Sequence, residues 1–70
     1  MTKERILQNL KSTEENWHSK TTFEIVNEIR IAVVDLSNLN GSEAISNAEN
    51  EEVLTKINEM LKWYLYGKED

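Results

Sequence analysis

TTFEIVNEIRIAVVDLSNLNG, residues 21–41, is the stretch that decides between two possible folds. Its many β-branched residues favour a strand, and Asn40-Gly41 is typical of a hairpin turn. As a strand over residues 23–36, however, it has five apolar residues of seven on one face and four of seven on the other. Alternation therefore gives no clear division between a buried and a solvated face.

Helical spacing accounts for the same stretch better, because residues three and four apart form one stripe in which only Thr22 is polar. Thr21 and Glu24 match a capping box at its start, and Asn40-Gly41 fits a left-handed C-cap at its end. We therefore predict a helix here, and an α+β fold with a central hairpin at 23–46 remains the alternative. The predicted core stripe consists of Thr22, Ile25, Val26, Ile29, Ala32, Val33, Leu36 and Leu39.

A first helix is predicted upstream of this stretch, with Thr2 placed to cap it. Its apolar pattern fades in the polar joint NWHSKTT, residues 16–22. Proline is absent from the chain and there are only two glycines, which favours long helices over a fold with many turns. The apolar side of this helix consists of Ile6, Leu7, Leu10 and Trp17.

A last helix is predicted from about Ala48 to Tyr66, where Ser46 and Glu49 form a second capping box and Gly67 is placed to end it. Residues 1–70 are thus expected to form one all-α domain, a small antiparallel three-helix bundle. The predicted core stripe of this helix is Val53, Leu54, Ile57, Met60, Leu61, Tyr64 and Leu65.

Composition narrows the possible functions. Seventy residues with no cysteine cannot rely on disulfides or thiolate zinc for stability. A net charge of -5 and a pI near 4.8 argue against direct binding of nucleic acid. The sequence has neither a secretory signal nor an apolar run long enough to cross a membrane, so the cytoplasm is expected. Abundant Asn, Ile, Lys and Glu suggest a bacterial or phage source with an AT-rich genome.

Catalytic chemistry has little support in the sequence. The only histidine, His18, lies in the polar joint, and there is no cysteine with which it could pair. Neighbouring carboxylates such as Glu51 and Glu52 point in different directions on a helix. We therefore expect no enzymatic activity, no catalytic residue, no cofactor and no metal site.

Aromatic residues off the core stripe give the positive functional hint. On the last helix, Trp63 falls roughly 130° from the centre of the stripe and Tyr66 nearly opposite it. Phe23, Ile31 and Val34 lie off the stripe of the central helix in the same way. Such aromatics are typical of interface hot spots, although a neighbouring helix could equally cover them. The predicted partner-binding residues are Trp63, Tyr66, Ile31, Val34, Glu49, Glu51, Glu52 and Glu59.

These features predict a non-enzymatic, small acidic protein-interaction module, acting as a regulator, inhibitor or immunity-type protein. Its partner would be another protein, toward whose basic surface the glutamates steer the chain. Two alternatives remain: an acidic nucleic-acid mimic that blocks a basic DNA- or RNA-binding protein, and a homodimeric structural protein.

Overall fold

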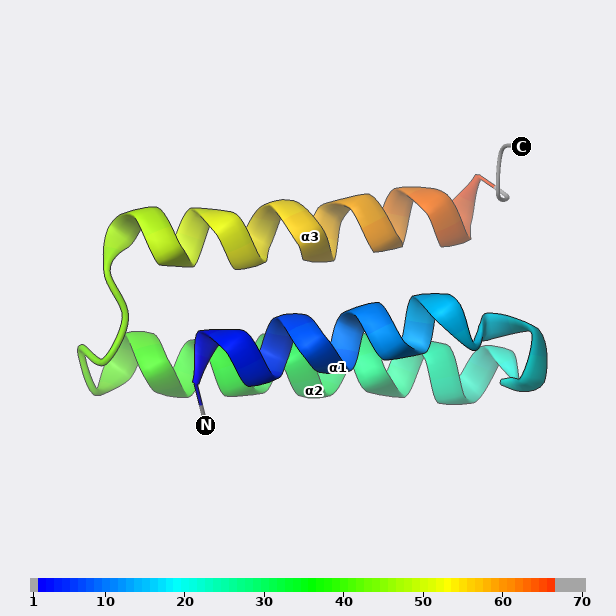
Figure 1. Cartoon of the computed structure of the whole chain (residues 1–70), viewed down its shortest axis with the longest axis horizontal. Helices are drawn as coiled ribbons and strands as arrows, with labels where there is room; N and C mark the ends of the chain where they lie inside the picture. Colours follow the sequence, from blue (N-terminus) through cyan, green and yellow to red (C-terminus); the bar gives the residue numbers. More distant parts are fainter. Residues whose placement is uncertain (1, 67–70) are drawn as a thin grey trace.

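The computed structural model describes residues 2–66, apart from the side chain of Leu65. It contains helices α1, Lys3–Glu15, α2, Thr22–Gly41, and α3, Asn47–Leu65, with a 3-10 turn η1, Trp17–Ser19, between the first two. Helices α1 and α3 run in the same direction and α2 runs against both (Figure 1). The predicted all-α three-helix bundle is confirmed, and the hairpin alternative is wrong because residues 22–41 are helical throughout.

The start of each α-helix is encoded locally. The side-chain oxygens of Thr2, Thr21 and Ser46 each accept a hydrogen bond from the backbone N–H three residues on. In α2 and α3 the carboxylates of Glu24 and Glu49 complete the exchange by accepting from the N-cap backbone N–H, at 2.8 and 3.0 Å. All three predicted N-caps are therefore confirmed.

The end of α2 differs from the prediction. The left-handed residue is not in Asn40-Gly41 but is Glu43, with φ of 59°, while Gly41 is still helical. The Glu43 N–H donates to the Asn40 carbonyl at 3.1 Å, and the Ala44 N–H donates to the Leu39 carbonyl at 2.9 Å. These two bonds make a Schellman motif, so the helix continues through its glycine and closes on a glutamate.

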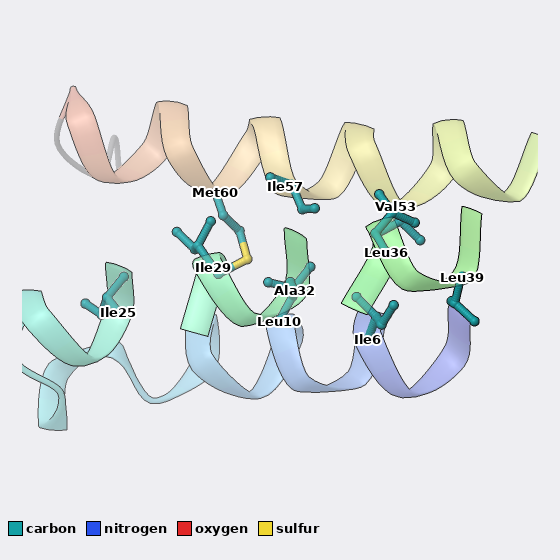
Figure 2. Packing of buried hydrophobic residues seen from close by; sticks show 10 residues of the cluster. All are labelled: Ile6, Leu10, Ile25, Ile29, Ala32, Leu36, Leu39, Val53, Ile57 and Met60. Atoms are coloured by element: carbon teal, nitrogen blue, oxygen red, sulfur yellow. The ribbon is translucent and has the colours of Figure 1, made fainter. Parts of the chain in front are cut away.

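The core is a single apolar cluster between the three helices, with Val53, Ile57 and Met60 of α3 directed toward α1 and α2 (Figure 2). Thr13 is also buried, and its hydroxyl donates to the Asn9 carbonyl at 3.0 Å. Tyr64 packs against this cluster, as predicted. The buried apolar residues are Ile6, Leu10, Ile25, Ile29, Ala32, Leu36, Leu39, Val53, Ile57 and Met60.

Four apolar residues of the predicted core stripes lie largely outside the core, and the one polar member, Thr22, is exposed as well. Val26 and Val33 of α2 remain 49% and 47% exposed, and Leu54 and Leu61 of α3 are also exposed. A helix that contacts only two neighbours buries a stripe little wider than 100°. These four residues sit roughly 80–100° from the centres of the buried stripes, and therefore at their edges.

Two ion pairs link α1 to α3. Lys3 Nζ lies 3.0 Å from Glu52 Oε1, and Lys56 Nζ lies 2.8 Å from Glu14 Oε1. The hydrogen bond to Glu52 raises the pKa of Lys3 above its ordinary value.

Within residues 2–66, no helix is both long and apolar enough to cross a membrane.

Candidate protein-interaction surface

The described part of the chain offers surfaces rather than a cluster of reactive groups. In residues 2–66 no three side chains of His, Asp or Glu are grouped so that they could hold a metal ion. His18 is exposed and lies against Trp17, with 4.2 Å between the ring centroids.

Trp63 contacts another part of the chain. Its ring meets that of Trp17 edge to face, with 5.4 Å between the centroids, and both residues are half-buried. Because the 3-10 turn η1 follows α1 directly, it carries Trp17 across to α3. Helical spacing alone could not reveal this contact, since it depends on the path of the joint.

The four predicted glutamates divide into two pairs. Glu49 accepts the capping bond from the Ser46 N–H, and chiefly for this reason its pKa lies below the ordinary value. Glu52 pairs with a lysine of α1. Glu51 and Glu59 are exposed. The structure therefore gives two of these carboxylates an internal role and leaves the other two facing solvent.

Tyr66 is 76% exposed. It borders an open surface depression of about 500 Å³ whose lining includes Thr55, Asn58, Glu59 and Lys62 of α3. A depression of this kind offers contact area to another molecule without enclosing a small ligand.

The outward side of α2 is unusually apolar. Ile31 and Val34 are exposed, as predicted, and so are residues that the predicted site omitted. Phe23 is 78% exposed, the largest value among the large apolar side chains in the described part of the chain. We call this surface the outer face of α2, and it consists of Phe23, Val26, Arg30, Ile31, Val33 and Val34.

Arg30 is the only basic residue of α2. Its Nε and Nη2 donate to Asn27 Oδ1 at 3.3 and 2.8 Å, which folds the guanidinium back along its own helix. The acidic residues of α2, Glu24, Glu28 and Asp35, lie roughly 120–160° around the helix from Arg30. The outer face of α2 therefore carries a single charge within an otherwise acidic molecule.

This apolar surface extends onto α3. Asn40 Nδ2 donates to Asn50 Oδ1 at 2.7 Å and so shows which sides of α2 and α3 adjoin. Val33 and Val26 precede Asn40 by steps of seven residues and share its side of α2. On α3, the exposed Leu54 and Leu61 share the side of Asn50.

From the exposed fractions, the apolar side chains of the outer face of α2 and the adjoining leucines present roughly 500 Å² to solvent, near the upper end for a monomer. The predicted partner-binding residues thus do not form one patch: Ile31 and Val34 lie on this surface, whereas Tyr66 and Glu59 lie on the solvent side of α3. Comparisons with protein-family models, curated proteins and solved structures found no match for this chain.

Proposed function

We propose that the chain is a non-enzymatic protein-interaction module, a small acidic regulator, inhibitor or immunity-type protein that acts in the cytoplasm by covering a surface of another protein. The outer face of α2 is the observation that supports this proposal. Phe23 at one end and the three valines along the helix are exposed, although other apolar residues of the same helix are buried in the core. Exposed apolar patches of this size are typical of protein interaction sites.

The apolar area of this surface can be compared with the free-energy cost of association. At about 25 cal/mol per Å², covering roughly 500 Å² contributes on the order of 12 kcal/mol, before any apolar area on the partner is counted. Association costs about 4–15 kcal/mol in lost translational and rotational freedom. Burial of the outer face of α2 therefore offsets much or all of that cost.

The remaining candidate residues have supporting roles in this proposal. Glu51 and Glu59 are exposed and are available to steer the chain toward a basic surface. Tyr66 provides a second aromatic contact on α3, away from the outer face of α2. Trp63, Glu49 and Glu52 are assigned to the stability of the bundle, because each has an intramolecular contact there.

The experiment starts from the residue at the centre of the proposed surface. A photo-crosslinking amino acid at position 34, with Gln8 on the exposed side of α1 as the control position, would capture the partner in cells. The affinity of the purified partner would then be measured by calorimetry for the wild type and for Phe23→Ser, Val34→Ser and Tyr66→Ser. The helix content of each variant would first be checked by circular dichroism.

We expect Phe23→Ser to weaken binding by roughly thirtyfold or more, as an aromatic hot spot worth at least about 2 kcal/mol requires. Tyr66→Ser should have a smaller effect. Binding that survives Phe23→Ser and Val34→Ser but is lost with Tyr66→Ser would move the interaction surface to α3. Steep weakening with added salt would favour the nucleic-acid-mimic alternative, because charge-dominated binding is screened.

A further inference from the structure

Neither backbone conformation nor close packing requires a glycine at position 41 in the described part of the chain. Gly41 is the last residue of α2, and alanine favours a helix more than glycine does. The left-handed position belongs to Glu43, so the backbone does not need glycine at position 41. A Cβ added there would meet no atom within 4 Å. Its missing side chain therefore leaves a bare spot on the helix that nothing in the described chain occupies.

Phe23 and Gly41 lie on the same side of α2, at its opposite ends. They are 18 residues apart, which is about five helical turns and about 27 Å. One end of the outer face thus carries its most exposed apolar side chain, and the other end carries no side chain. A large side chain and a bare backbone are complementary shapes, as in ridge-into-groove packing of helices.

We propose that the outer face of α2 binds a second copy of this chain, with the two α2 helices antiparallel about a two-fold axis that crosses this face midway between Phe23 and Gly41. In that arrangement each Phe23 ring lies over Gly41 of the other copy, and the contact repeats itself by symmetry. A parallel arrangement would instead place phenylalanine on phenylalanine and arginine on arginine. The shapes and charges of the helix therefore select the antiparallel one.

The charges on this surface permit two copies to meet. Arg30 is folded onto Asn27, and the antiparallel pairing offsets it from its counterpart by about 6 Å, or one turn, along the helix axis. It then lies near Val33 and Val34 of the other copy, whose methyl groups can pack on its aliphatic stem. The acidic residues that give the chain its net charge of -5 lie mainly on other sides of the bundle.

The area also fits a second copy. The roughly 500 Å² of apolar side-chain surface, together with Asn27, Arg30 and Ser37 beside it, approaches the roughly 800 Å² that each partner contributes to a standard interface. A second copy would also supply apolar burial that a chain of 70 residues lacks on its own. This inference rests on the proposed function in one respect, which is that both use the outer face of α2. A chain that has bound a second copy through this face cannot bind another partner protein through it at the same time.

The test measures the absolute mass of the purified full chain by light scattering coupled to size exclusion, from low micromolar to near-millimolar concentration. The wild type should shift from monomer to dimer across this range. Gly41→Leu places a side chain where Phe23 of the other copy would lie, and Phe23→Ser removes the ring. Each should weaken dimerisation at least tenfold.

Matched controls separate this effect from unfolding. Leucine favours a helix more than glycine, so Gly41→Leu should keep or raise the thermal midpoint measured well below the dimerisation range. Gln8→Leu adds the same side chain at an exposed position of α1 and should leave the mass profile unchanged. If Gly41→Leu lowered the helix content, Phe23→Ser would decide the outcome.

Cysteine cross-linking tests the orientation, since the chain has no cysteine of its own. The antiparallel pair brings Val26 of one copy beside Ser37 of the other, so a mixture of Val26→Cys and Ser37→Cys proteins should give mixed disulfide dimers on oxidation. Cross-linking of Val26→Cys with itself in preference would show a parallel pair and overturn the proposed arrangement.

Two further results would overturn self-pairing. A monomer at every concentration would exclude it, and a dimer unchanged by both Gly41→Leu and Phe23→Ser would place the contact elsewhere. Neither result bears on partner binding, which the Phe23→Ser and Val34→Ser titrations of the captured partner test separately.

Discussion

Replacement of Glu43 by glycine is expected to stabilise the protein. Glu43 is the one residue other than glycine with a positive φ in the described part of the chain, at 59°. In this conformation Cβ crowds the neighbouring carbonyl oxygen, at a cost of about 1–2 kcal/mol for an L-residue. Glycine adopts it without strain and keeps both hydrogen bonds of the Schellman motif, which involve only the backbone.

The magnitude follows from two opposing effects. Relief of the strain contributes about 1–2 kcal/mol, and the greater freedom of glycine in the unfolded chain removes about 0.5–1 kcal/mol. We expect a net gain of about 0.5–1 kcal/mol in the free energy of unfolding. In a domain of this size a gain of about 1 kcal/mol raises the thermal midpoint by about 4–8 °C.

The assay is urea denaturation followed by circular dichroism, at one protein concentration low enough to keep the chain monomeric. Glu43→Ala is the matched control, because it also removes a carboxylate from the C-terminal end of α2 but retains Cβ. Glycine should exceed alanine by about 0.5–1 kcal/mol, because both variants lack the carboxylate and only glycine relieves the strain. Equal gains for the two variants would show that charge, and not backbone strain, is responsible, and would refute the reasoning.

Three further predictions concern the bundle. Met60→Ala empties a side-chain site that is fully buried and should lower the free energy of unfolding by about 2–5 kcal/mol, measured by urea denaturation. The folded-state pKa of Glu49 is lowered, so its stabilising contribution is present above the ordinary glutamate value and is lost as pH falls through the folded-state pKa. The stability difference between wild type and Glu49→Gln should therefore shrink on acidification, and a difference independent of pH would contradict the capping role. Trp63→Ala removes a half-buried ring and should lower the free energy of unfolding by about 0.5–3 kcal/mol. It should also weaken the near-ultraviolet dichroism of the Trp17–Trp63 pair, and an unchanged thermal midpoint would return Trp63 to the interaction surface.

Structural features that depend only on residues close together in the sequence could be predicted. The three helices follow from apolar spacing, and the N-caps follow from Thr2, Thr21 and Ser46 because each bond spans only three residues. Ile31 and Val34 were placed off the core for the same reason, since their position on α2 depends only on helical spacing.

Features that depend on the arrangement of the helices could not be predicted. Helical spacing predicts that Val33 and Leu61 belong to the core. An apolar residue at the edge of a stripe is buried only if a neighbouring helix lies on that side, and for these two residues none does. Helical spacing on α3 predicts that Trp63 faces outward. It cannot show that Trp17 of η1 lies against the Trp63 ring. The end of α2 was misplaced because glycine usually takes the left-handed position, which Glu43 occupies here.

The three side-chain N-caps also bear on the speed of folding. Each cap fixes the first residue of its helix through bonds that span only three residues, so the start of every helix is specified before any two helices meet. What remains is the docking of three amphipathic helices across two short connections. Small helical bundles dominated by such local contacts fold in about microseconds to milliseconds, and this chain has the features of that group.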